Sequence, residues 1–277
     1  MKLSPGFCQH RARQMLFTYT IPPKGETLFS FREDYYREVS QCGMCGHVRN
    51  HYRFDFDPET FYRMTYNQVT YGDRFRQEYD RIMALPFSES NNKQRVRSLK
   101  ELVYEHMDDQ QDLYEKRWRV LDIGSGLCVF LAEMRKSGIW DGTALDPDPR
   151  AVAHARDVVG VEAIEGRFGG VEPVPYDIGT YDLVTFNNVI EHVPDPVRML
   201  TQAKDYLKPY GLVYVEVPDG EEAVKRGQDA PELFVEHLHA FSVVSLALAI
   251  VQAELTVLRI DRVVEPNGNL TLRGYCR

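Results

Sequence analysis

Two acidic residues and two glycines lie at the ends of apolar segments, where they could bind a ribose-containing ligand. The segment Val120–Cys128 reads VLDIGSGLC, which puts Gly124 and Gly126 in a turn directly after an apolar stretch and Asp122 just before that turn. Glycine permits a tight turn and a close approach of ligand to backbone. Asp146 follows 24 residues after Asp122, a spacing at which a carboxylate could accept from both ribose hydroxyls. The simpler alternative is that the glycines only form turns.

A second group of residues could bind a metal ion near the N-terminus. Cys42 and Cys45 enclose two residues, the spacing with which two thiolates bind one tetrahedral zinc ion. Cys8 and His10 would complete a Cys3His set, and His47 is a spare donor. Zinc would stabilise a module too small for a large core. The alternative is a pair of reduced thiols with a structural or redox role, because the usual second CxxC is missing.

Segment 234–242, FVEHLHAFS, carries the best candidates for removing a proton from an acceptor molecule. His237 could act as general base, with Glu236 orienting it or contacting the acceptor. His239 is a second candidate base. The Glu-His pair at 191–192 precedes VPDP, and its place at the start of a turn favours a structural or cofactor-side role. The histidines of the first segment could instead cap a loop or the following helix.

An alternation of strands and helices must position these residues from about residue 117 onward. Helices are expected at 129–137, 149–158, 196–207 and 243–252. Strands are expected at 119–124, 143–146, 162–164, 181–187, 211–217, 255–264 and 269–276. The last two strands must be antiparallel neighbours, because their short connection cannot hold a crossover helix. We therefore predict an α/β fold with a Rossmann-like, mostly parallel seven-stranded sheet and an antiparallel C-terminal hairpin.

The composition divides the chain into three parts. Residues 1–75 are rich in Tyr, Phe, Arg, Cys and His, and predict the short strands and turns of a small zinc-binding module. Residues 76–116 predict two amphipathic helices, a linker or lid, interrupted near 86–92. Residues 117–277 form the Rossmann-like domain. Four tyrosines could line an acceptor lid or, more simply, form the core of the small module: Tyr62, Tyr66, Tyr71 and Tyr79.

The overall composition limits the partners. The chain has 277 residues and a formal net charge of −8, which argues against nucleic acid because phosphate backbones require a basic surface. The most apolar stretch, 241–251, is too short to span a membrane. The first 13 residues lack the apolar run of a secretory signal. Five cysteines suit a reducing compartment, so we expect a cytoplasmic protein whose oligomeric state stays open.

Three motifs together resemble those of the class I S-adenosylmethionine-dependent methyltransferases: VLDIGSG at 120–126, ALDPDP at 144–149 and YDLVTFNNVIEHVPDP at 181–196. The resemblance covers about residues 117–277, with Cys128 where the family often has a third glycine. A nicotinamide-dependent enzyme would also use a glycine turn and an acid, but the C-terminal hairpin and the EHVPDP continuation count against it.

This resemblance implies S-adenosylmethionine as cofactor and assigns residues to each part of it. The methionine portion would lie against Asp122, Gly124 and Gly126, and the ribose against Asp146. The adenine would lie near Gly166, Arg167 and Phe168, and the sulfonium near Asn187, Asn188 and Val189.

The N-terminal part is similar to the zinc-binding module of some sugar methyltransferases, including C-methyltransferases of nucleotide-linked deoxysugars. The similarity rests on residues 35–40, which lead into CGMCGHV, and on the aromatic residues that follow. Those enzymes carry a Tyr-x-Glu-His motif whose histidine and neighbours serve catalysis; Phe234 replaces the tyrosine here. Two departures are the C-x-H of Cys8 and His10 in place of a first CxxC, and an end at Arg277 without their further C-terminal domain.

The resemblance implies methyl transfer from S-adenosylmethionine to a small molecule, namely a sugar or nucleotide-linked sugar, with oxygen favoured over carbon or nitrogen. A non-catalytic scaffold that keeps the fold is one alternative, and the intact Asp122, Gly124 and Asp146 count against it. Methylation of a protein or RNA, with the zinc module as reader, is another alternative. The acidic net charge counts against RNA.

Overall fold

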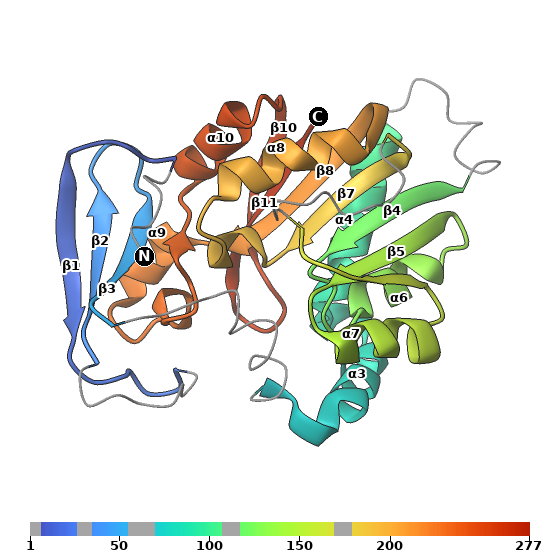
Figure 1. The fold of residues 1–277 in the computed structure, drawn as a ribbon, viewed down its shortest axis with the longest axis horizontal. Helices are drawn as coiled ribbons and strands as arrows, with labels where there is room; N and C mark the ends of the chain where they lie inside the picture. Colours follow the sequence, from blue (N-terminus) through green and yellow to red (C-terminus); the bar gives the residue numbers. More distant parts are fainter. Residues whose placement is uncertain (1–6, 27–34, 55–69, 107–116, 169–178) are drawn as a thin grey trace.

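Two β-sheets lie side by side in the protein, one small and one large (Figure 1). The computed structural model describes residues 7–26, 35–54, 70–106, 117–168 and 179–277. The N-terminal strands form most of the small sheet, and the chain from residue 118 onward forms the large one.

The large sheet has seven strands in the order β10-β11-β8-β7-β4-β5-β6. The neighbouring strands β8, β7, β4, β5 and β6 are all parallel. In contrast, β11 pairs antiparallel with both β8 and β10. The fold class predicted from the sequence, including its C-terminal hairpin, is therefore confirmed. The strands are β4 (Trp118–Ile123), β5 (Trp140–Asp146), β6 (Glu162–Glu165), β7 (Tyr181–Asn187), β8 (Leu207–Pro218), β10 (Val257–Val264) and β11 (Leu270–Cys276).

Helices cover both faces of this sheet because its strands are apolar on both sides. Along β7, Val184 and Phe186 lie in the core formed with α8 and α10, whereas Leu183 lies in the core formed with α4, α6 and α7. Among the described residues, no helix is long and apolar enough to cross a membrane. The helices are α3 (Phe75–Ala84), α4 (Asn91–His106), α6 (Val129–Arg135), α7 (Pro149–His154), α8 (Pro196–Tyr206), α9 (Gly220–Arg226) and α10 (Val243–Gln252).

The small sheet contains a strand from a distant part of the chain. Its order is β1 (Arg13–Tyr19), β2 (Arg37–Cys42), β3 (Val48–Tyr52) and β9 (His239–Ala240). β9 pairs antiparallel with β3, with Arg49 opposite His239. The segment that follows β8 thus completes the N-terminal sheet. Sequence analysis expected only a loop there and missed both β9 and α9. The division of the chain into three parts at residues 75 and 116 stays a prediction.

The sheet topology creates a crevice at its centre. β4 is flanked by β5 on one side and β7 on the other, so the connections from β4 and β7 lead in opposite directions across the sheet. Ligands of open α/β sheets bind at such a switch point, outside the carboxyl ends of the strands. The predicted cofactor residues lie at or directly after the carboxyl ends of β4, β5, β6 and β7.

Candidate active site

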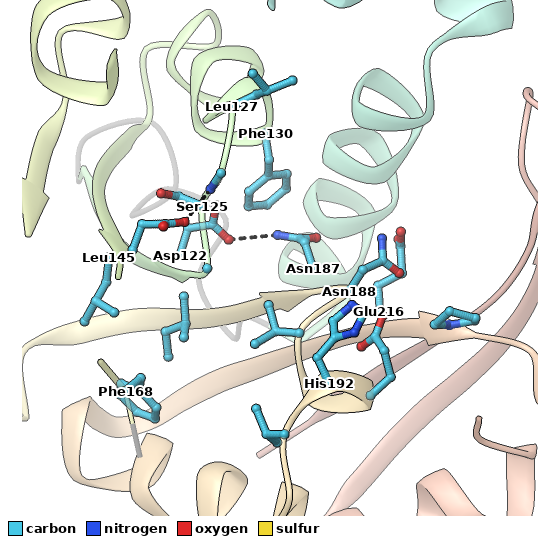
Figure 2. A pocket seen from close by; sticks show the side chains of 18 of the residues that line it. Asp122, Ser125, Leu127, Phe130, Leu145, Phe168, Asn187, Asn188, His192 and Glu216 are labelled. Carbon is cyan, nitrogen blue, oxygen red and sulfur yellow. Dashed lines mark hydrogen bonds and ion pairs between the residues drawn. The ribbon is translucent and has the colours of Figure 1, made fainter. Parts of the chain in front are cut away.

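A pocket of about 980 Å³ opens at the carboxyl ends of β4, β5, β7 and β8 (Figure 2). The residues that line it come from positions between Tyr71 and Thr271 in the chain. All the residues predicted for the cofactor or for catalysis line it: Asp122, Gly124, Gly126, Asp146, Gly166, Arg167, Phe168, Asn187, Asn188, Val189, Glu236 and His237.

Asp122 anchors the glycine turn at the end of β4. Its buried Oδ1 accepts hydrogen bonds from Thr185 Oγ1 at 2.6 Å and Asn187 Nδ2 at 2.8 Å, the latter visible in Figure 2. Burial raises the pKa of Asp122 to about 6, although these two hydrogen bonds oppose the shift. Gly124 has a φ of +69°, and a Cβ there would lie 2.8 Å from Val189 Cγ2. The turn therefore requires glycine at this position.

Asp146 links the end of β5 to the same turn. Its Oδ2 accepts from the amide of Gly126 at 2.8 Å, and its Oδ1 accepts from the amide of Asp148 at 2.9 Å. Each carboxylate oxygen has two lone pairs, so Asp146 can still accept from two ligand hydroxyls. Burial raises its pKa to about 6. Cys128, at the third-glycine position, has a φ of +56°, a left-handed conformation that glycine adopts without strain.

The loop after the 3₁₀ turn η6 (Pro231–Leu233) brings Glu236 and His237 to the pocket. Burial lowers the pKa of His237 to about 4, although hydrogen bonds with the backbone of Pro231 and Glu232 oppose the shift. The ring is therefore neutral at pH 7, and its Nδ1 has no hydrogen-bond partner among the described residues. Burial raises the pKa of Glu236 to about 7. The loop thus presents a neutral imidazole beside a carboxyl group that titrates near neutrality.

The 3₁₀ turn η5 (Ile190–His192), after β7, lies next to this loop and also lines the pocket. The His192 ring stacks on the His237 ring, with centroids 4.8 Å apart and planes 25° apart. His192 Nδ1 donates to the carbonyl oxygen of Glu236 at 2.9 Å. Glu191 is fully buried, and neither carboxyl oxygen has a hydrogen-bond partner in the described part of the chain. Glu191 and His192 therefore belong to the same pocket wall as His237.

Side chains of the N-terminal sheet hold the backbone of the Glu236–His237 loop. Asn50 Nδ2 donates to the carbonyl oxygen of His237 at 2.6 Å. Tyr52 Oη donates to the carbonyl oxygen of Val235 at 2.7 Å, and the amide of Val235 donates to Glu26 Oε2 at 2.8 Å. The small sheet is thus part of the pocket's framework.

His239, the second candidate base, makes a different set of contacts. Its Nε2 donates to the carbonyl oxygen of Val193 at 3.1 Å, which leaves Nδ1 as an acceptor for His47 Nε2, also at 3.1 Å. Both imidazoles are buried. His47, the spare metal donor of the sequence, lies in this histidine pair, and both residues connect the N-terminal sheet to the loop beside η5.

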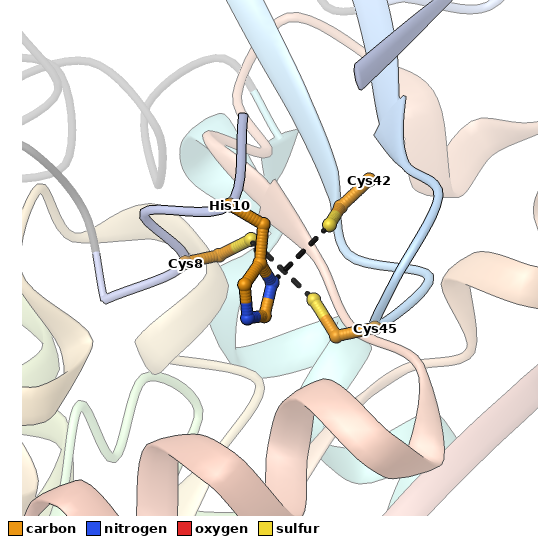
Figure 3. Close-up of side chains that lie close together, drawn as sticks. All are labelled: Cys8, His10, Cys42 and Cys45. Carbon is orange, nitrogen blue, oxygen red and sulfur yellow. Dashed lines mark hydrogen bonds between the residues drawn. The ribbon is translucent and has the colours of Figure 1, made fainter. Parts of the chain in front are cut away.

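The four predicted metal ligands converge on one point (Figure 3). Cys8 Sγ lies 3.4 Å from Cys45 Sγ, and His10 Nδ1 lies 3.5 Å from Cys8 Sγ and 3.3 Å from Cys42 Sγ. All five cysteines of the chain are free thiols. Ligands of one tetrahedral zinc are about 3.6–3.8 Å apart, given its usual bond lengths. The spacing and chemistry of this donor set therefore suit zinc.

Sequence analysis missed a buried ion-pair network beside the pocket. Arg95, on α4, forms a two-pronged ion pair with Glu216, near the end of β8. Arg273 Nε and Tyr214 Oη also donate to Glu216, at 3.1 and 2.6 Å. Burial would raise the pKa of Glu216, but Arg95 and Arg273 lower it overall. A carboxylate inside the apolar segment GLVYVEV was the one local signal of this network.

The four tyrosines considered for a lid have different positions. Tyr71 lines the pocket. Tyr79 packs against the ring of His154, on α7, with the ring centroids 4.8 Å apart, and is not among the residues that line the pocket. Tyr62 and Tyr66 lie outside the described residues.

Comparisons with known proteins agree with this geometry. A family model described as a methyltransferase domain matches residues 74–260. An uncharacterized methyltransferase of Mycobacterium sp. (strain KMS) is 34% identical over 93 residues, which are 34% of this chain and 36% of that protein. A ubiquinone biosynthesis O-methyltransferase of Xanthomonas oryzae pv. oryzae (strain PXO99A) is 34% identical over 101 residues, 35% of this chain and 41% of that protein. The matches thus span well under half the length of these relatives.

Among solved structures, a SAM-dependent methyltransferase from Aquifex aeolicus superposes with a TM-score of 0.52 at 17% identity, over 80% of this chain and 98% of that one. At this identity the likeness concerns the fold. The family match covers more than half of the chain and includes the glycine turn, Asp146 and the end of β7. The chain therefore belongs to the methyltransferase-domain family and has the fold of the S-adenosylmethionine-dependent methyltransferases.

Proposed function

We propose that the protein transfers the methyl group of S-adenosylmethionine to a hydroxyl of a small molecule, a sugar or a nucleotide-linked sugar. The observation that carries this proposal is one pocket that is lined both by the predicted cofactor residues and by the Glu236–His237 loop. S-adenosylmethionine supplies an activated methyl group on a good leaving group. The protein must therefore hold the acceptor in line and accept its proton.

The polar atoms at the strand ends suit the parts of the cofactor. Asn187 Oδ1 is buried and has no hydrogen-bond partner among the described residues, so beside the Asp122 carboxyl it can accept from an ammonium group. Asp146 would accept from the ribose hydroxyls. Gly124 and Gly126 would complete the methionine site. The remaining assignments place Gly166, Arg167 and Phe168 by the adenine, and Asn188 and Val189 by the sulfonium.

His237 and Glu236 are the proposed catalytic residues. His237 Nδ1 is a neutral acceptor in the pocket, as proton removal from a hydroxyl requires. A weakly basic imidazole is sufficient if the proton leaves late, when the oxygen already carries the methyl group and has become strongly acidic. Glu236, whose pKa lies near 7, would orient His237 or contact the acceptor.

A hydroxyl-rich acceptor is supported by the polar part of the pocket lining. Glu191, Glu236 and His237 line the pocket, and each has a buried oxygen or nitrogen atom with no hydrogen-bond partner among the described residues. The similarity of the FVEH segment and of the cysteine module to sugar methyltransferases supports a sugar. The printed name of the Xanthomonas relative describes an O-methyltransferase, which supports oxygen as the target atom.

We further propose that Cys8, His10, Cys42 and Cys45 hold a structural zinc ion. The amide of Met44 donates to Cys42 Sγ at 3.4 Å, as in turns that carry metal-bound thiolates. Zinc would fix the turn between β2 and β3 and, through β3, the sheet that holds the catalytic loop. Five free thiols also suit the reducing cytoplasm.

Methyl transfer from labelled S-adenosylmethionine to a panel of sugars and nucleotide-linked sugars tests this function. Transfer to a hydroxyl that is strongly reduced in His237→Ala, with S-adenosylhomocysteine binding retained, is the expected result. Cofactor binding without transfer to any sugar would contradict the sugar acceptor, and unchanged turnover of His237→Ala would contradict the base.

A further inference from the structure

We propose that Glu191 and His237 form the binding site for the reacting hydroxyl of the acceptor. In this site, the Glu191 carboxylic acid donates a hydrogen bond to the hydroxyl oxygen, and the hydroxyl donates to His237 Nδ1. The inference rests on the proposed function and adds Glu191 as a residue that contacts the reacting atom.

The geometry suits one oxygen atom between the two side chains. Glu191 is 0% exposed, both of its carboxyl oxygens lack a partner within the described ranges, and it lines the pocket. A carboxyl oxygen of Glu191 and a ring nitrogen of His237 lie within 4.8 Å of each other. An oxygen that makes two hydrogen bonds of about 2.8 Å at a tetrahedral angle separates its partners by roughly 4.6 Å. The two side chains are therefore close enough for a single hydroxyl to bridge them.

The surroundings of Glu191 determine which group donates. A buried carboxylate without a counter-charge is strongly unfavourable. The cation candidate beside Glu191 is His192 Nε2, 3.6 Å from Oε1, but burial lowers the pKa of His192 well below its usual value. Burial, reinforced by Glu216, raises the pKa of Glu191 well above its usual value, although the backbone amide of Glu191 itself opposes the shift. Glu191 is therefore a neutral acid that can donate, and His237 is a neutral ring that can accept.

A site with one hydrogen-bond donor, Glu191, and one acceptor, His237, selects an alcohol as the methyl acceptor. A hydroxyl oxygen can accept from Glu191 and donate to His237 at the same time. A reacting amine nitrogen has a single lone pair, which must attack the methyl carbon and so cannot also accept from Glu191, and a carbon acid offers neither hydrogen bond at its reacting atom. In the transfer, the hydroxyl oxygen forms the bond to the methyl carbon, the carbon–sulfur bond breaks with its electron pair on sulfur, and the hydroxyl proton passes to His237 Nδ1. Glu191 keeps its proton throughout.

A crystal structure of the full chain with S-adenosylhomocysteine tests the site without an identified acceptor. We expect an ordered water within hydrogen-bond distance of both a Glu191 carboxyl oxygen and His237 Nδ1, in the place of the hydroxyl oxygen. Glu191 turned to bond His192 Nε2, or His237 Nδ1 bonded to another protein group, would overturn the proposal. Infrared difference spectra of the same complex should show a protonated carboxyl band that Glu191→Gln removes; an ionised Glu191 would also overturn it.

A pair of variants separates a donor from a base or a structural residue. Glu191→Gln keeps a neutral donor, so it should retain at least about 10-fold more of the kcat/KM for a hydroxyl acceptor than Glu191→Ala does. Glu191→Ala removes the donor, and kcat/KM should fall about 10- to 100-fold. S-adenosylhomocysteine affinity and Tm are read on both variants. Equal losses in the two variants would overturn the donor role. Lost cofactor binding in the native protein would instead refute the proposed function itself.

Discussion

The side-chain amide of Asn50, in the N-terminal sheet, donates a hydrogen bond of 2.6 Å to the carbonyl oxygen of His237, in the active-site loop. The two residues are 187 positions apart in the chain. The same amide group also reaches the carbonyl oxygen of Phe234, and Asn50 Oδ1 accepts from Arg37. The N-terminal sheet therefore positions the loop that carries the proposed base, which gives this module a part in catalysis beyond its own stability.

Asn50→Ala should reduce kcat about 10-fold or more, because several buried carbonyl groups lose their donor and the loop is no longer held. The affinity for S-adenosylhomocysteine should change little, because the cofactor residues lie at or directly after the carboxyl ends of β4, β5, β6 and β7. Kinetics and calorimetry on one preparation check both points. Arg53→Ala, which removes a largely exposed ion pair beyond the end of β3, is the matched control and should behave like the native protein. A normal kcat in Asn50→Ala would refute the positioning role.

Asp146→Ala should weaken the binding of S-adenosylmethionine at least about 10-fold, since it removes the acceptor for the ribose and frees the amide of Gly126. Isothermal titration measures the change. Asp141→Ala, at the exposed start of the same strand, serves as the control and should bind normally. Equal affinities for the two variants would contradict the assignment of Asp146.

Cys42→Ser should lose zinc and lower Tm by several degrees, because the turn between β2 and β3 would lose its cross-link. Metal analysis and thermal unfolding of the full chain check this. Cys276→Ser alters a buried thiol on β11, outside the cluster, and should retain about one zinc per chain. A native protein that purifies without zinc and does not gain stability when zinc is added would contradict the zinc site.

Glu236 should make stability depend on pH in a defined direction. Burial raises its pKa from 4.5 in the unfolded chain to about 7 in the folded protein, so the folded state binds the proton more tightly. The resulting stabilisation is fully present below pH 4.5 and is lost as pH rises through 7. It amounts to about 3 kcal/mol at most.

Glu236→Gln should remove this contribution, so the free energy of unfolding should change less between pH 5 and pH 8 than in the native protein. Chemical denaturation at both pH values measures the difference. Glu101→Gln, an exposed position on α4, should leave the pH dependence intact. The same pH dependence in native protein and Glu236→Gln would show that the carboxyl group is not buried in a protonated form.

The large sheet could be predicted because its signals are local. Each strand is a short apolar run, and the tight connection between Val264 and Leu270 leaves an antiparallel hairpin as its only solution. The cofactor edge could be predicted for the same reason, since Gly124 and Asp146 directly follow their strands. The four metal ligands could be proposed from residue type and spacing, before any contact between them was known.

The remaining features depend on contacts between distant segments. β9 has only two residues and exists because β3 offers an open edge, which no pattern in residues 218–242 indicates. The pairing of Arg95 with Glu216 joins residues 121 positions apart. The sequence favoured a structural or cofactor-side role for Glu191, because its burial and the stacking of His192 on His237 result from the packing of η5 on the loop after η6.

Titration of S-adenosylhomocysteine into the purified, zinc-replete protein tests the central claim most directly. The account predicts saturable binding at about one site per chain in the micromolar range, weakened in Asp146→Ala and retained in His237→Ala. No binding by a folded, metal-replete protein would contradict the assignment of the pocket and the proposed methyl transfer together.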